Sequence, residues 1–146
     1  MTAEQPQIDN RLLDVKDLKT YYPIRKGLFR KVVGHVRAVD GVNFTLRKGD
    51  TLGLVGESGC GKTTTGRTIV RLLDPTAGTM RFNDPDLGWV NLEAMDRKEL
   101  LPIRKNVQMI FQDPFSSLNP RLTVKRIVAE PLVVNRVASG DELTER

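Results

Sequence analysis

The feature that most constrains this chain is a glycine-rich run, GESGCGKT, at residues 56–63. It fits the phosphate-loop pattern G-x-x-x-x-G-K-[ST], in which a turn between a strand and a helix directs several backbone N–H groups at one anion. The apolar run at 51–55 predicts a buried strand ahead of the loop, and helix-period apolar residues within 64–73 predict a helix behind it. The positive end of that helix would face the phosphates. The pattern therefore predicts a site for a nucleoside triphosphate.

Two side chains of the loop supply what backbone amides cannot. Lys62 is placed to reach the β- and γ-phosphates, and the Thr63 hydroxyl is placed to hold a magnesium ion. Cys60 is the single cysteine, so the chain can form no internal disulfide. We interpret Cys60 as an inert small residue of the loop in preference to a thiol that is sensitive to oxidation. The loop residues expected to bind ATP are Gly56, Glu57, Ser58, Gly59, Cys60, Gly61, Lys62, Thr63 and Thr64.

Length and composition indicate a small globular protein. With 146 residues the chain can bury one ordinary core, which predicts one domain or most of one. No apolar stretch approaches the roughly 18–20 residues that a membrane-spanning helix needs. The polar, acidic residues 1–7 are unlike a signal peptide, so export is not expected, and one cysteine fits a reducing cytosol.

The net charge of +5 is concentrated in one segment. The sequence has no acidic residue between Asp17 and Asp40, and its basic residues there are Lys19, Arg25, Lys26, Arg30, Lys31 and Arg37. Such a segment is typical of a solvated loop, although nucleic acid or an anionic membrane surface also suits it. An ATP site favours positive surroundings too, and aromatic residues make up only 5% of the chain, so we do not expect nucleic acid as a partner.

Upstream of the phosphate loop, the sequence predicts a mostly antiparallel β layer over residues 9–50, preceded by a disordered segment at 1–8. A strand at 12–18 runs toward two tyrosines, where Pro23 interrupts it. After a basic stretch with turn glycines, a second strand is expected at 35–39. Alternating apolar residues then predict a strand at 42–47, and a tight turn at 48–50 leads into the strand expected before the phosphate loop.

Downstream, turn residues and short apolar runs alternate. Asp96 and Glu99 have the spacing of a capping box, with Pro102 breaking or kinking the helix that follows. Thr123 can cap a later helix, whose reach Pro131 limits. The other expected elements are a turn at 74–78, strands at 79–82, 89–92 and 107–111, and a helix capped by Ser139 or Asp141.

A second informative cluster is IFQDPFSSLNPR at residues 110–121. Gln112 directly follows the expected buried strand at 107–111, and Asp-Pro breaks the chain behind it. In a parallel α/β sheet this carboxyl end of a strand is where ligands bind. The amide oxygen of Gln112 can bind a metal ion or a water. Without the phosphate loop, we would interpret Gln112 as an ordinary polar residue at the end of a strand.

Together these residues make the chain resemble the ATP-binding subunits of ABC transporters, especially the F-type subunit of bacterial oligopeptide and dipeptide importers. The matching stretches lie at 22–29, 38–42, 54–63 and 111–121. The phosphate loop (Walker A) is shared by many NTPases, whereas the glutamine loop FQDP continued by SSLNPR is far more selective. The resemblance implies an α/β fold: a P-loop NTPase (ABC ATPase) core with an N-terminal antiparallel β layer.

The resemblance also implies roles for individual residues. Tyr22 looks like the aromatic that stacks on adenine, with neighbouring Tyr21 as the alternative. Ala38 is expected to touch the adenine or ribose. Gln112 looks like the residue that ligates magnesium together with Thr63 and relays the nucleotide state to the membrane subunits. The expected catalytic residues are Lys62 and Gln112, and the expected cofactors are ATP and Mg²⁺.

Several motifs of the family do not occur in these 146 residues. There is no LSGGQ-like signature and no apolar strand ending in Asp-Glu, and His35 precedes the phosphate loop, so it cannot be the switch histidine. Because phosphoryl transfer needs a positioned water as well as charge neutralisation, we expect ATP binding with weak or absent turnover. The resemblance implies a partial domain over 9–146, with the core to the glutamine loop at 51–112 and the start of a helical subdomain, truncated before its completion, at 113–146.

In this family two ATP-binding subunits, identical or different, sandwich ATP and drive transmembrane permease subunits. The resemblance thus implies a peripheral position on the cytoplasmic face of the inner (plasma) membrane and an indirect link to an extracytoplasmic solute-binding protein. One alternative is another P-loop NTPase, such as a small-molecule kinase or a DNA-repair ATPase, although these lack the upstream β layer and the extended glutamine-loop sequence. A basic nucleic-acid-binding module is the other alternative.

Overall fold

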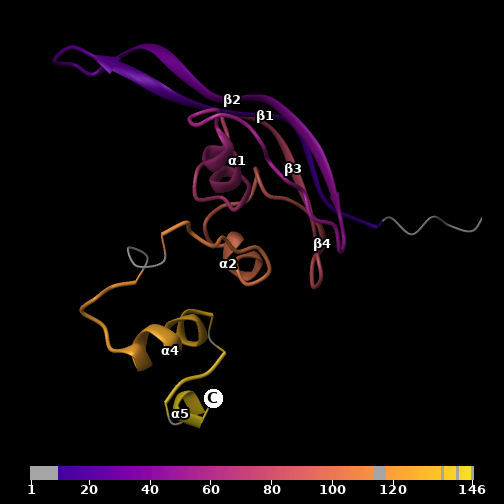
Figure 1. The fold of residues 1–146 in the computed structure, drawn as a ribbon, viewed down its shortest axis with the longest axis vertical. Helices are drawn as coiled ribbons and strands as arrows, with labels where there is room; N and C mark the ends of the chain where they lie inside the picture. Colours follow the sequence, from indigo (N-terminus) through magenta and orange to yellow (C-terminus); the bar gives the residue numbers. More distant parts are fainter. Residues whose placement is uncertain (1–9, 114–117, 136, 141, 146) are drawn as a thin grey trace, which may run out of the picture.

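An antiparallel sheet dominates the fold. The computed structural model describes residues 10–113, 118–135, 137–140 and 142–145, so the segment 1–8 lies outside the description. The sheet has the strand order β2-β1-β3-β4, and all three pairings are antiparallel (Figure 1). Its strands are β1 (Arg11–Lys26), β2 (Lys31–Arg47), β3 (Ala77–Asp84) and β4 (Gly88–Asn91). The expected N-terminal β layer is therefore present.

The first two strands are longer than the sequence predicts. β2 joins the two strands expected at 35–39 and 42–47, and β1 continues through Pro23, which lies opposite His35. The prediction that Pro23 interrupts this strand is wrong. β3 pairs with β1 only from Leu13 to Lys19, so beyond Lys19 one edge of β1 has no neighbouring strand among the described residues. A proline is tolerated there because its missing N–H removes no ladder hydrogen bond.

Four short helices complete the described fold. They are α1 (Lys62–Ile69), α2 (Leu100–Ile103), α4 (Val124–Val134) and α5 (Glu142–Glu145). α1 begins two residues earlier than expected and ends four residues earlier, at Ile69. The capping box before α2 is confirmed, because Asp96 Oδ1 accepts from the Glu99 N–H at 2.8 Å and Glu99 Oε2 accepts from the Asp96 N–H at 2.7 Å. Pro102 lies in the first turn of α2, where a helix needs no proline amide.

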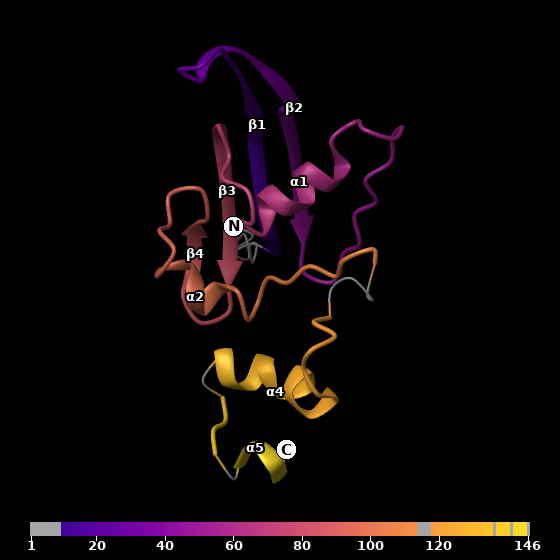
Figure 2. The same cartoon turned by 90° about the vertical axis from the view of Figure 1, so that its left-hand side faces the viewer.

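The C-terminal helices lie apart from the sheet in both views (Figures 1 and 2). Thr123 caps α4, because its hydroxyl accepts from the Arg126 N–H at 3.4 Å. Contrary to the expectation that Pro131 limits this helix, α4 continues to Val134. Pro131 lies inside α4 and lacks an N–H donor, but the helix continues for three residues beyond it. Of the two expected caps for α5, Asp141 lies outside the described residues. None of the described helices is long and apolar enough to span a membrane.

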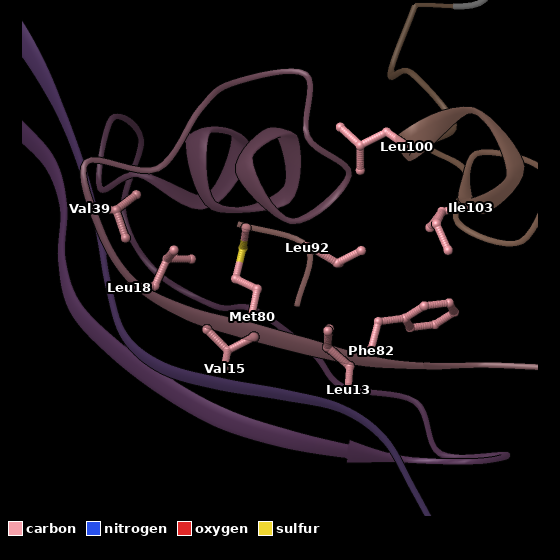
Figure 3. Packing of buried hydrophobic residues seen from close by; sticks show 9 residues of the cluster. All are labelled: Leu13, Val15, Leu18, Val39, Met80, Phe82, Leu92, Leu100 and Ile103. Carbon is pink, nitrogen blue, oxygen red and sulfur yellow. The ribbon is translucent and has the colours of Figure 1, made fainter. Parts of the chain in front are cut away.

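The core forms on the concave side of the sheet. Side chains of β1 and β3, including Val15 and Met80, point toward the layer that carries α1 and α2 (Figure 3). Ile103 of α2 closes the same cluster and is almost completely buried. A hydrogen bond of 3.0 Å between the buried hydroxyls of Thr20 and Thr68 connects β1 to α1. These contacts fix α1 beneath the sheet and so position the loop that precedes it.

The strands expected at 51–55 and 107–111 are not formed, so these two predictions are wrong. Both segments lack regular structure, and the side chains of Val55 and Ile110 are 96% and 97% exposed. A parallel strand is buried only when hydrogen-bonded strands flank it and helices cover both of its faces. Within the described ranges no strand pairs with either segment. The apolar runs are therefore present without the neighbours that would bury them.

One glycine of the sheet, Gly78, has no room for a larger side chain. Gly78 in β3 has φ +97°, and a Cβ there would lie 2.4 Å from the Asp17 carbonyl oxygen. We expect Gly78→Ala to lower the free energy of unfolding by about 3 kcal/mol or more, because backbone strain and a clash with backbone combine. The matched control is Gly88→Ala, at φ +70° with open space around it, for which we expect a loss of about 1 kcal/mol. Urea unfolding followed by far-UV circular dichroism measures both, and equal losses would contradict the clash.

Candidate functional site

The phosphate-loop sequence forms the turn into α1, as its spacing predicts. Gly61 is the N-cap of the helix and has φ +96°, a backbone conformation that only glycine adopts readily. Its carbonyl oxygen accepts from both the backbone N–H and the hydroxyl of Thr65, at 2.8 and 3.0 Å. Thr65 is buried, so the end of the loop is anchored to a fixed helix.

A bulge in β2 brings Ala38 against this loop. Thr20 pairs with Val39 and Tyr21 pairs with Arg37, which leaves Ala38 as the extra residue of the longer strand. A Cβ on Gly61 would lie only 2.2 Å from the Ala38 carbonyl oxygen, so the two backbones are in direct contact. Ala38 and the phosphate loop are thus neighbours, and the bulge is the feature that makes them so.

The Lys62 side chain folds over the loop. Its Nζ donates to the carbonyl oxygens of Gly56 and Glu57, both at 2.7 Å, and lies 3.6 Å from the Cys60 Sγ. Residues 51–60 are exposed, so the ammonium sits where a solvent-borne anion can reach it. Lys62 and the loop are therefore held together at the N-terminal end of α1.

Backbone donors gather at the same end of the helix. Among the described residues, the N–H groups of Gly59, Gly61, Lys62 and Thr63 donate to no acceptor, whereas that of Cys60 donates to Glu57 at 3.3 Å. The first amides of any helix lack intrahelical partners, and the helix dipole makes that end attractive to anions. The Thr63 side chain is exposed, and its hydroxyl oxygen is the kind of ligand atom that Mg²⁺ prefers.

The two neighbouring tyrosines point to opposite faces of β1. The Tyr21 hydroxyl donates to Asp40 Oδ1 at 2.5 Å, and the Arg37 guanidinium lies 5.6 Å from the ring centroid. The hydrogen bond raises the pKa of Tyr21 and lowers the pKa of Asp40. Tyr21 is therefore held by polar neighbours of β2.

Tyr22 lies on the face of β1 that covers α1. Alternate residues of a strand share a face, and Thr20, two residues before Tyr22, contacts Thr68 of α1. The Tyr22 side chain is 41% exposed, which leaves its ring accessible from that side. The geometry thus separates the two tyrosines that sequence reasoning left as alternatives.

Gln112 is not brought into the loop by any contact that the structure describes. The segment before it runs beside α1, because a Cβ on Gly66 would lie 3.8 Å from the Met109 Cε. Gln112 is exposed, and within the described residues no hydrogen bond joins it to Thr63. Residues 114–117 of the glutamine-loop cluster lie outside the description. The described residues also hold no group of three or more His, Cys, Asp or Glu side chains that could bind a metal.

Comparison with known proteins gives consistent relatives. The ABC transporter family matches residues 39–145. The oligopeptide transport ATP-binding protein AppF of Bacillus subtilis (strain 168) is 49% identical over 135 residues, which are 92% of this chain and 40% of AppF. The oligopeptide transport ATP-binding protein OppF of Lactococcus lactis subsp. lactis (strain IL1403) is 50% identical over 123 residues, 84% of this chain and 37% of OppF. The chain thus spans about two-fifths of the length of these relatives.

The fold agrees with a solved ATP-binding cassette. The dimeric structure of such a cassette in a post-hydrolysis state, bound to ADP and Pi, superimposes with a TM-score of 0.69 at 25% identity. The match covers 92% of this chain and 53% of that chain. It supports the expected α/β P-loop fold, of which the described residues include the antiparallel layer and the helix after the loop. On the family match over residues 39–145, the chain belongs to the ABC transporter family.

Proposed function

We propose that this chain carries the nucleotide-binding half-site of an ABC importer that couples ATP hydrolysis to the uptake of oligopeptides, dipeptides or similar small solutes. The observation that carries the proposal is the cluster of free backbone N–H groups at the start of α1, next to the Lys62 ammonium. This combination of dipole, amides and cation suits a triphosphate tail. The names of AppF and OppF, both oligopeptide transport ATP-binding proteins, support peptides as the cargo of the whole transporter.

In this proposal the loop binds the phosphates and β1 binds the base. Lys62 exchanges its two carbonyl contacts for oxygens of the β- and γ-phosphates, while amides from residues 56–64 bind the remaining phosphate oxygens. Tyr22 stacks on the adenine, and Ala38 lines the space between the base and the loop. The donors that would hold Mg²⁺ are the Thr63 hydroxyl and the Gln112 amide oxygen, and the ion would neutralise phosphate charge.

The half-site is proposed to bind ATP without sustained turnover by the isolated 146 residues. Lys62 and the loop amides neutralise charge, but hydrolysis also requires a group that positions the attacking water. The sequence of this chain contains no Asp-Glu-ended apolar strand to supply that group. Hydrolysis is thus assigned to the assembled transporter.

The assembly that we propose has three kinds of partner. A second ATP-binding subunit, identical or different, closes the site, and the dimeric cassette bound to ADP and Pi supports this arrangement. Transmembrane permease subunits receive the conformational change, and an extracytoplasmic solute-binding protein acts indirectly. The chain would then be peripheral on the cytoplasmic face of the inner membrane and would use no nucleic acid.

The two tyrosines test where the nucleotide lies. We expect Tyr22→Ala to weaken binding of ATP about tenfold, because stacking of a base on an aromatic ring is worth about 1–3 kcal/mol. Tyr21→Ala removes an equal ring from the opposite face and should leave the affinity within about twofold. Isothermal titration with MgATP measures both. If Tyr21→Ala alone weakens binding, the adenine lies on the other face of β1 and the proposed site is wrong.

A further inference from the structure

The basic segment between Asp17 and Asp40 is not a loop but a projecting two-stranded arm. Among the residues that the structure describes, β1 pairs beyond Lys19 only with β2, and these two strands extend past the rest of the sheet (Figure 1). We call residues 20–37 the hairpin arm. Its tip is a turn at 27–30, which the Arg30 N–H closes by donating to the Gly27 carbonyl oxygen at 3.0 Å. A turn of this kind presents its two central side chains outward, at the end of the arm.

Those two central side chains are large and apolar. Leu28 is 93% exposed and Phe29 is 94% exposed. Isolated apolar residues are common on protein surfaces, but two adjacent ones at the point of a projecting hairpin are not explained by packing. Burying the Leu28 and Phe29 side chains against an apolar surface would lower the free energy, whereas leaving them in water does not.

Cations stand immediately behind the apolar tip. Lys26 and Lys31 occupy opposite positions in the last pair of the β1–β2 ladder, where like charges destabilise a hairpin. Arg25 and Arg30 lie next to them in sequence, and no acidic side chain pairs with any of these four among the described residues. An anionic surface would relieve the repulsion between the two lysines.

We propose that the tip of the hairpin arm docks on an anionic phospholipid bilayer. Leu28 and Phe29 enter the boundary between headgroups and acyl chains, and the four cations behind them meet the lipid phosphates. This order, apolar residues foremost with Lys and Arg behind, is the pattern of interfacial membrane anchors. A nucleic-acid backbone would require the cations foremost, because binding there comes mainly from phosphate contacts. The inference goes beyond nucleotide binding and does not depend on it.

Vesicle flotation of the 146-residue chain, without nucleotide, tests the proposal. We expect binding to vesicles of phosphatidylcholine and phosphatidylglycerol in equal parts and no binding to phosphatidylcholine alone. Lys26→Gln/Lys31→Gln should weaken binding about 25-fold, since each cation near an anionic membrane contributes about fivefold. Leu28→Ser/Phe29→Ser should weaken it about tenfold or more, because the tip then gains nothing from entering the bilayer.

Matched controls distinguish binding by the hairpin arm from nonspecific binding by exposed apolar or charged side chains elsewhere. Val124→Ser/Val128→Ser removes two exposed apolar side chains from α4, and Lys98→Gln/Arg104→Gln removes two exposed cations elsewhere. Neither should change vesicle binding. Losses equal to those of the arm variants would overturn the proposal, as would arm variants that bind like the wild-type chain.

Fluorescence reports whether the tip enters the bilayer. Phe29→Trp should shift its emission to the blue on anionic vesicles, whereas the wild-type chain, whose single tryptophan is Trp89 in β4, should not. Bound Phe29→Trp protein without a shift would overturn the proposed insertion. Binding to duplex DNA that is tighter than binding to vesicles, and lost in Lys26→Gln/Lys31→Gln, would assign the arm to nucleic acid instead. A failure of membrane insertion and a preference for DNA would both leave the proposed ATP site untested, because these experiments contain no nucleotide.

Discussion

Lys62→Ala is expected to weaken binding of MgATP about a hundredfold, the largest loss from any single side chain of the site. The Nζ donates to two carbonyl oxygens of the loop at 2.7 Å, so the ammonium is held at the loop and would exchange these contacts for oxygens of a bound phosphate. A charge-assisted hydrogen bond contributes about 1.5–3 kcal/mol, and the lysine can make two. A loss of about 3 kcal/mol corresponds to the expected factor of about a hundred.

Isothermal titration with ATP and with AMP isolates the contribution of this lysine. The loss should appear with ATP and should be small with AMP, because Lys62 is proposed to contact the β- and γ-phosphates. Lys48→Ala is the matched control, since it removes an exposed lysine from the turn that precedes residues 51–55. Equal losses in the two variants would show that only the general positive charge matters. Phosphate release by the wild-type chain should stay at background, and steady release that depends on Lys62 would contradict a half-site without a water-positioning group.

Local signals in the sequence predict the parts of the fold that local interactions determine. The spacing of the phosphate loop predicts a turn into a helix, and Gly61 with Thr65 forms that junction through bonds between near neighbours. The capping box at Asp96 and Glu99 follows from the same principle. Alternation at 42–47 likewise predicts the end of β2 correctly.

Predictions fail where structure depends on partners that are distant in the sequence. The runs at 51–55 and 107–111 are as apolar as buried strands, yet burial of a parallel strand requires neighbours on both sides. The prediction at Pro23 fails for the same reason. A proline breaks a strand only where its N–H would be needed for pairing, and within the described residues the edge of β1 at Pro23 is free because β3 stops pairing with β1 at Lys19.

The candidate site divides in the same way. The loop residues can be named from their motif, and Ala38 from a family resemblance, but the contact between Ala38 and Gly61 has no signal in the sequence. It arises because β2 has one more residue than β1 between neighbouring pairs, and only the register of the two strands reveals this. The choice between Tyr21 and Tyr22 also depends on register, since Thr20 fixes which face meets α1.

The contact between Gly61 and Ala38 leads to the second large effect. At Gly61 a Cβ would lie 2.2 Å from the Ala38 carbonyl oxygen and 3.7 Å from the Val39 Cγ2, and φ is +96°. Gly61→Ala must therefore displace either the bulge of β2 or the first turn of α1. We expect the free energy of unfolding to fall by about 3 kcal/mol or more, because left-handed strain and a clash with backbone combine.

Because either displacement changes how the first turn of α1, with its free amides, sits against the Ala38 bulge, Gly61→Ala should also weaken ATP binding by more than about tenfold. Gly49→Ala is the control, since φ there is +84° and nothing lies within 4 Å of the added Cβ. It should cost about 1 kcal/mol in urea unfolding and leave ATP binding unchanged. Adding Ala38→Gly should not restore either property of Gly61→Ala, because the obstructing atom belongs to the backbone. Restoration by Ala38→Gly, or ATP binding by Gly61→Ala equal to that of the wild-type chain, would show that the loop does not depend on its contact with β2.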